Sequence, residues 1–65
     1  MLEVSGTFAE VKAGDVMVKG TVSRVAPATR SRAGRMLMVI EFDHGTWTET
    51  WVVDPEGRAN WKRPE

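Results

Sequence analysis

The sequence of 65 residues contains no cysteine and only one histidine, His44. Without cysteine the chain forms no disulfide, and one histidine is too few for the usual Cys/His structural zinc site. A chain this short buries one small hydrophobic core, and it lacks these two common stabilisers of small domains. We therefore predict a single domain over residues 1–65, with His44 as an ordinary turn residue.

Long hydrophobic segments are also absent. The longest uncharged apolar run is Met36–Ile40, far below the roughly 18 residues of a membrane helix. The N-terminus lacks the basic region and the apolar stretch of a secretory signal. These features predict a cytoplasmic protein, bacterial or viral, that makes no contact with a membrane.

Motifs for catalysis and cofactor binding are missing as well. The sequence has no nucleophile elbow, phosphate-binding loop or dinucleotide fingerprint, and its six glycines are scattered singly. Glu49 lies between two tryptophans, but no second catalytic group stands at a diagnostic spacing from it. The sequence therefore predicts a non-enzymatic binding module with no cofactor, no metal and no small-molecule substrate.

Helix-forming stretches are rare, and short runs of β-branched residues separated by Gly or Pro dominate the chain. Only residues 7–13 are compatible with a short helix. We predict five strands, namely Leu2–Phe8, Val16–Val25 with a bend at Gly20, Met36–Phe42, Trp47–Val53 and Arg58–Trp61. Tight turns are predicted at Asp43–Thr46 and Asp54–Gly57. Residues 26–35 are predicted to form a polar, basic loop, and residues 62–65 a charged tail.

Five short strands favour one small barrel, because closure removes exposed sheet edges. An SH3-like barrel is the first choice, and an OB-like barrel is the alternative. In Val11–Val22 a Gly-Asp turn leads into a strand that soon meets a second glycine, and this resembles SH3-like barrels. Glu41–Trp47 is similar to their hydrophobic–Asp–x–Gly hairpins. The resemblance implies a fold and no functional residues; the chain is also similar in style to small accessory proteins of bacteriophages.

Charge of each sign is segregated along the chain, although nine Lys and Arg balance nine Asp and Glu. From Val16 to Ile40 every charged residue is basic, namely Lys19, Arg24, Arg30, Arg32 and Arg35. From Glu41 to Gly57 every charged residue is acidic, namely Glu41, Asp43, Glu49, Asp54 and Glu56. Three interpretations are open. The two blocks pair within the fold, the basic loop is merely solvated, or the loop binds a phosphate backbone or an acidic protein surface.

Trp47 and Trp51 project from one face of their predicted strand. If the preceding turn has an even number of residues, this face pairs with Met36, Met38, Ile40 and Phe42 and forms the core with Val53. An odd number would shift the pairing. Glu49 lies on the same face and would need a partner such as Arg24 or Arg35, since an unpaired buried charge is very costly. Trp61 is the better candidate for exposure.

The strand Met36–Phe42 is apolar on both faces, because Leu37 and Val39 alternate with the core residues. A strand that is apolar on both faces is normally covered on both. Either the N-terminal strand or a second copy of the chain would supply the second cover. The sequence thus motivates a self-association hypothesis.

The leading hypothesis is a regulatory or accessory protein that binds nucleic acid through the basic loop and the basic C-terminal region. The predicted partner-binding residues are Arg24, Arg30, Arg32, Arg35, Arg58, Trp61, Lys62 and Arg63. The alternative is an inhibitor or adaptor that docks its Trp/Met face or a sheet edge on a protein. A third hypothesis is a structural subunit of a larger assembly.

Overall fold

The computed structural model describes the backbone of residues 1–32 and 34–65, and the side chains of residues 1–27 and 36–65. Its strands are β1 (Leu2–Thr7), β2 (Val16–Met17), β3 (Gly20–Arg32), β4 (Arg35–Asp43), β5 (Thr48–Val53) and β6 (Arg58–Arg63). The helix-compatible window contains a single short 3-10 helix, η1 (Phe8–Glu10). The predicted all-β class is therefore confirmed.

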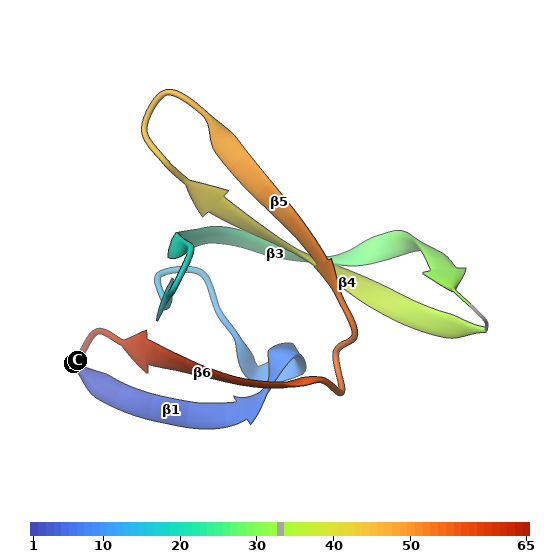
Figure 1. Ribbon diagram of the computed structural model, residues 1–65, viewed down its shortest axis with the longest axis horizontal. Helices are drawn as coiled ribbons and strands as arrows, with labels where there is room; N and C mark the ends of the chain where they lie inside the picture. The colour runs from blue at the N-terminus through green and yellow to red at the C-terminus, as the bar shows by residue number, and fades with distance from the viewer. Residues whose placement is uncertain (33) are drawn as a thin grey trace.

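The strands form one antiparallel sheet in the order β1-β6-β2-β3-β4-β5. In Figure 1, β3, β4 and β5 lie together, and β1 and β6 lie together below them. The short β2 connects the two groups by pairing with β6 on one side and β3 on the other. The sheet curls around the core but does not close, because β1 pairs with β6 and not with β5. The structure thus differs from the predicted closed barrel of five strands.

The core lies between the two groups of strands. Its buried apolar residues are Val11, Met17, Val22, Met38, Ile40, Phe42 and Trp61. Trp51 packs edge-on against Phe42 and Phe8, with ring centroids 5.5 Å and 6.5 Å apart. The predicted core face of the β4–β5 hairpin is confirmed for its inner residues, and Val53 also packs against the core.

The ends of that predicted face lie outside the core. Met36 and Trp47 keep 60% and 57% of their surface exposed. Asp43 pairs with Thr48, so the turn between the two strands has an even number of residues. This is the condition under which the sequence predicted the core face of the hairpin. This register sets Phe42 opposite Glu49, two residues further along than the predicted partner Trp47. Trp47 consequently sits in the connecting loop.

The predicted strand Val16–Val25 is wrong, because the chain reverses direction within it. Met17 pairs with Gly20, so the two residues between them form a tight hairpin turn. Gly20 has a φ of +130°, a backbone conformation that is open essentially to glycine alone. Gly20 therefore ends the turn between β2 and β3 and does not bend a continuous strand.

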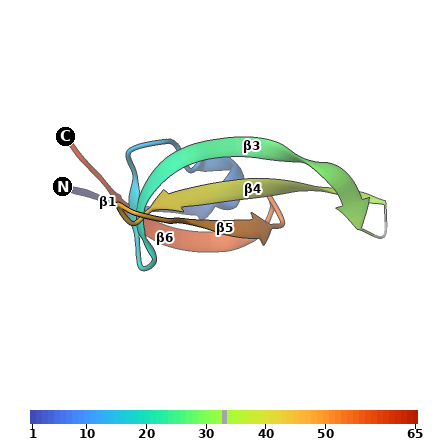
Figure 2. The ribbon, with the colours of Figure 1, turned by 90° about the horizontal axis from the view of Figure 1, so that it is seen from above.

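The predicted basic loop 26–35 is also wrong in its conformation. β3 continues to Arg32 and β4 begins at Arg35, with these two residues paired in register. An irregularity between Pro27 and Ser31 interrupts the pairing of the two strands. We call residues 27–36 the arm. Figures 1 and 2 both show β3 and β4 continuing side by side past the other strands.

The two turns predicted at Asp43–Thr46 and Asp54–Gly57 are present in the structure. Gly45 has a φ of +87° in the loop between β4 and β5, and its N–H donates to Asp43 Oδ1 at 2.8 Å. The Gly57 N–H donates to the Asp54 carbonyl at 2.9 Å and closes the turn before β6. The predicted charged tail begins later than expected, because β6 continues through Lys62 to Arg63.

Candidate basic interface

The basic and acidic blocks of the sequence meet across the sheet at two points. Arg24 donates to the Glu41 carboxylate through Nε at 2.9 Å and also through Nη2. Lys19 Nζ lies 3.4 Å from Glu49 Oε2 and 5.6 Å from the centroid of the Trp51 ring. Glu49 therefore has Lys19 as a basic partner, and the predicted partner Arg24 pairs with Glu41 instead. The side chain of Arg35, the other predicted partner, lies outside the described residues. Part of the segregated charge is neutralised inside the fold.

The arm carries the rest of the basic block. Arg30, Arg32 and Arg35 lie on its backbone, and the sequence between residues 25 and 40 contains no carboxylate. Arg30 and Arg32 are two residues apart on β3, and Arg35 is the register partner of Arg32. Positions two apart on a strand, and positions directly opposite each other, share one face of a hairpin. The backbone thus brings three arginine positions close together near the end of a projecting element.

Arg63, another predicted site residue, takes part in an internal ion pair. Its Nε and Nη2 donate to the two oxygens of Asp15 at 2.8 Å and 2.9 Å, and Nη2 also donates to the Glu10 carbonyl at 3.1 Å. Asp15 is only 2% exposed, and it also accepts a hydrogen bond from the Lys12 N–H at 2.8 Å. The bidentate Arg63 contact is the main reason that the pKa of Asp15 lies below its ordinary value.

Sequence reasoning missed Asp15, because it lies 48 residues from its arginine partner. The sequence places it only in a Gly-Asp turn, which is a common local feature. No spacing pattern connects such a turn with a residue near the other end of the chain. The pairing arises because Val16, the next residue, pairs with Lys62 in the sheet.

The prediction that Trp61 is exposed is wrong, since it is 4% exposed and belongs to the core. Val4 on β1 is its register partner, and the curl of the sheet covers the ring. Within the described part of the chain, its Nε1 has no hydrogen-bond partner. The strongly exposed tryptophan is Trp47, which stacks on His44 with ring centroids 4.1 Å apart.

The other basic residues of β6 remain on the surface. Arg58 and Lys62 are exposed and lie four residues apart on one strand, with exposed Asn60 between them. β6 pairs with β1 and β2, whereas the arm belongs to β3 and β4. The predicted site residues therefore separate into the arm, the exposed face of β6, and the two internally paired arginines.

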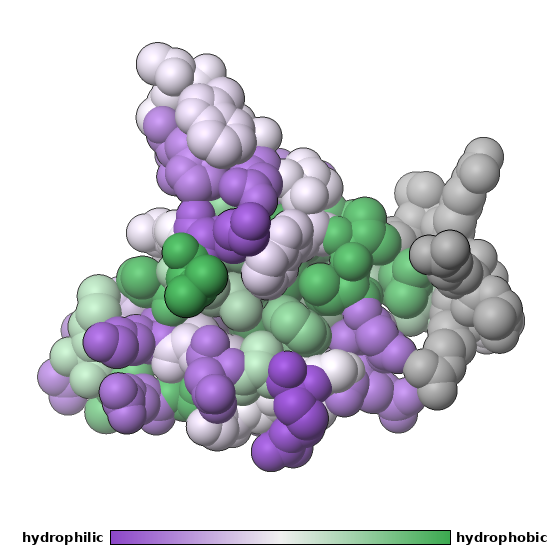
Figure 3. All heavy atoms as spheres, in the orientation of Figure 1, coloured by the Kyte–Doolittle hydropathy of each residue, from purple (hydrophilic) through white to green (hydrophobic). Residues whose placement is uncertain are grey.

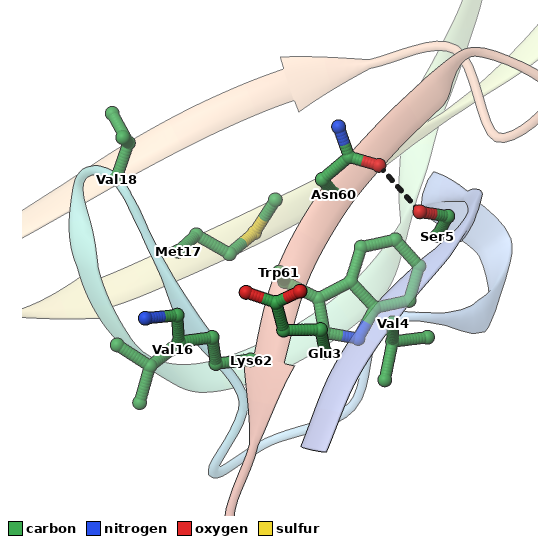
Figure 4. A pocket seen from close by; sticks show the side chains of 9 residues that line it. All are labelled: Glu3, Val4, Ser5, Val16, Met17, Val18, Asn60, Trp61 and Lys62. Atoms are coloured by element: carbon green, nitrogen blue, oxygen red, sulfur yellow. Dashed lines mark hydrogen bonds between the residues drawn. The ribbon is translucent and has the colours of Figure 1, made fainter. Parts of the chain in front are cut away.

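A groove of about 580 Å³ opens where β6 pairs with β2 at a single position, Val16 with Lys62. Figure 4 shows Met17 and Trp61 among its lining, with Glu3 on the β1 side. The charges of Glu3 and Lys62 offset each other at this groove. It therefore lacks the excess positive charge that an anionic ligand requires.

Within the part of the chain that the structure describes, no group of three or more His, Cys, Asp or Glu side chains could hold a metal ion. The same residues include no helix that is both long and apolar enough to span a bilayer. Comparison with known proteins gives no match to a family model, a curated protein or a solved structure.

Proposed function

We propose that this protein is a non-enzymatic binding module that contacts nucleic acid through the arm. The distribution of arginines over the protein is the main support for this proposal. Arg24 and Arg63 are paired with carboxylates within the sheet, whereas Arg30, Arg32 and Arg35 lie on a projecting hairpin whose sequence contains no acid. A guanidinium group binds phosphate oxygens in a bidentate manner and keeps its charge at every physiological pH.

The form of the arm favours a duplex as the nucleic acid. The major groove of B-DNA is wide enough to admit a two-stranded β-ribbon, whereas the major groove of A-form RNA is too narrow for side chains to read. The arm is a ribbon of this kind, formed by β3 and β4 alone. Arg58 and Lys62, exposed on β6, would add phosphate contacts outside the groove.

Within this proposal the protein acts in the cytoplasm as a regulatory or accessory factor. Its curled sheet is then an open relative of the SH3-like barrels. The Gly14–Asp15 turn supports this relationship, because it leads directly into β2 and closes on β3 through hydrogen bonds with Val22 of 2.8 Å.

The test replaces Arg30, Arg32 and Arg35 together by alanine and measures duplex binding by fluorescence anisotropy over a range of salt concentrations. Each phosphate contact contributes about −0.9 to the slope of log affinity against log salt. If all three arginines contact phosphates, the slope becomes shallower by about 2.7, and affinity at low salt falls steeply. A wild-type protein that fails to bind a duplex at low salt contradicts the proposal.

A charge-matched control replaces Lys12, Arg58 and Lys62, three exposed basic residues outside the arm. This variant has the same net charge as the arm variant and keeps the arm. We expect a clearly smaller loss of affinity, limited to peripheral phosphate contacts and the general field of the protein. Equal losses in both variants would show that binding follows net charge, and would refute a specific role of the arm. Circular dichroism checks that both variants fold.

The alternative, docking on a protein, had two candidate surfaces. The Trp/Met face is largely interior, because Met38 is buried and Trp51 packs against the core. Figure 3 shows that hydrophobic residues are nevertheless visible across the middle of one face, with hydrophilic residues above and below them. The second candidate surface, a sheet edge, is available at β5.

A further inference from the structure

β5 is a free edge of the sheet. In the described part of the chain it pairs with β4 alone. The His44 N–H donates to the Trp47 carbonyl at 3.0 Å, which fixes the phase of the hairpin. Because hydrogen-bonded and non-hydrogen-bonded pairs alternate along an antiparallel ladder, residues 49, 51 and 53 bond to β4. Residues 48, 50 and 52 therefore direct their N–H and C=O groups away from the sheet.

This edge lacks most of the features that usually prevent two edges from pairing. Natural edge strands carry an exposed lysine, a proline, a bulge, a cover or an inward-pointing charge. β5 has the sequence TETWVV, in which four of six residues are β-branched and none is proline, glycine or lysine. Its single charge, Glu49, lies on the inner face within 3.4 Å of Lys19 and 3.3 Å of His44. The outward-facing positions of β5 carry only threonine and valine.

The opposite edge of the sheet, β1, is blocked at its C-terminal end. The Phe8 N–H donates to the Gly57 carbonyl on the side of β6, so the Thr7 N–H faces the free side of β1. Glu10 Oε2 already accepts this N–H at 2.7 Å and the Thr7 hydroxyl at 3.2 Å. The Glu10 carboxylate also lies close against Gly6. An added strand that extended to Thr7 would have to displace this carboxylate, whereas no such side chain caps the described residues of β5.

An apolar row on the outer face of the sheet ends at this open edge. Ala26, Val39 and Val52 are register partners across β3, β4 and β5. Val52, the last of the three, is 59% exposed. This is the second apolar face that the sequence indicated for residues 36–42. On the described strands it continues to the edge of β5 without a further strand beside it.

We propose that a second copy of this chain pairs antiparallel along β5, with Thr50 opposite Thr50 of the second copy. This register joins outward-facing residues on both strands, so both sets of free backbone groups are satisfied. On the outer face it sets Thr50 beside its own copy and Val52 beside Thr48, and both are favourable cross-strand neighbours.

Charge complementarity selects this register over its neighbours. The register centred on Thr50 sets Glu49 of each copy opposite Trp51 of the other. Within each copy, Lys19 Nζ lies 5.6 Å from the centroid of the Trp51 ring. A register centred on Glu49 would oppose two carboxylates directly, which is destabilising. A register centred on Trp51 would set Glu49 against Val53 of the other copy. Of the three registers, only the first sets the acidic group beside the Trp51–Lys19 contact of the second copy without opposing two carboxylates.

The test exploits the absence of cysteine from the chain. Thr50→Cys places one thiol in each copy at the proposed two-fold axis. Directly opposed residues of a hydrogen-bonded pair have Cα atoms about 5.5 Å apart, within the range for a disulfide. Under mild oxidation we expect this variant to cross-link at least about tenfold faster than Ser5→Cys, which places an exposed thiol on the other edge strand, β1, away from the proposed two-fold axis. Equal rates for the two variants overturn the proposal.

A second measurement avoids thiols. Sedimentation of the wild-type protein should show a reversible monomer–dimer equilibrium, and Thr50→Pro should abolish the dimer. Proline removes an N–H that β4 does not use, so the monomer keeps its fold, which circular dichroism verifies. A wild-type protein that stays monomeric at high micromolar concentration contradicts the inference. Duplex binding by such a monomer would leave the function proposed for the arm intact.

Discussion

Asp15 is the residue at which three separate segments of the chain are joined. Its carboxylate binds the Lys12 N–H and the Arg63 guanidinium, and its backbone carbonyl accepts the Val22 N–H at 2.8 Å. These contacts connect the segment before β2 with β6 and β3. Removing one partner of a buried ion pair leaves the other without compensation and costs about 3–5 kcal/mol. Arg63 keeps 32% of its side chain exposed, so we expect the loss on removing the Asp15 charge to fall at the lower end of this range. For a small domain this is still a large share of the total stability.

Asp15→Asn should lower the free energy of unfolding by about 3 kcal/mol near neutral pH, since it removes the charge that Arg63 binds. Urea unfolding followed by tryptophan fluorescence measures this loss. The matched control is Glu56→Gln, which neutralises an exposed carboxylate in the turn before β6. It should change stability by less than about 0.5 kcal/mol.

The difference in unfolding free energy between the wild type and Asp15→Asn should depend on pH. The pKa of Asp15 is lower in the folded protein than in the unfolded chain, chiefly through its Arg63 hydrogen bonds. The stability that it contributes is therefore fully present above the ordinary Asp pKa of about 3.9. It is lost as the pH falls through the lower folded-state pKa. The difference between the wild type and Asp15→Asn should be constant near neutrality and shrink in acid; a constant difference down to the lowest pH contradicts this account.

Among the elements, the β2–β3 and β4–β5 connections make different demands on glycine. Gly20, at the end of the β2–β3 reversal, has a φ of +130°, and a Cβ there would lie 3.4 Å from His44 Cε1. Gly45, between β4 and β5, has a φ of +87° and no atom within 4 Å of a built Cβ. Asparagine tolerates the left-handed region near Gly45 but not the conformation of Gly20.

We therefore expect Gly20→Asn to lower the unfolding free energy by about 1–3 kcal/mol. Gly45→Asn should lower it by less than about 1 kcal/mol. Thermal and urea unfolding of the two variants, prepared in parallel, measure the difference. Equal destabilisation would mean that the reversal at Val18–Lys19 does not depend on the special backbone of Gly20.

At the scale of the whole molecule, zero net charge conceals an uneven distribution of positive charge. Lys19 and Arg24 are paired with acids on the body of the sheet, whereas the arm carries +3 from Arg30, Arg32 and Arg35. The arm lies at the opposite end of the molecule from the two chain termini (Figure 2). Binding through such an arm depends on a local field, so it should be strongly sensitive to salt.

The proposed pairing of β5 strands also predicts how stability depends on concentration. Association of folded chains stabilises them by mass action, so the thermal midpoint of the wild type should rise with protein concentration. The midpoint of Thr50→Pro should be independent of concentration, because its monomer has no partner. A concentration-independent midpoint in the wild type, measured by differential scanning calorimetry, would contradict the pairing.

Local sequence was enough to predict the all-β class, the turns at Gly45 and Gly57, and the inward side of the β4–β5 hairpin. These features follow from local propensity and from the alternation of apolar residues, which act over a few neighbours. The arm was predicted as a loop, because Pro27 and the polar residues after it give no alternating pattern. The pairing with β4 decides its conformation instead.

Only the tertiary structure decided which residues of each type are available to a partner. Trp61 is buried because β1 and β6 pair along their whole length, and Arg63 binds Asp15 because β2 pairs with β6. The structure also decided that the sheet stays open, which leaves β5 as an edge. These outcomes depend on contacts between residues far apart in the sequence, and no local pattern of charge or hydrophobicity specifies such contacts.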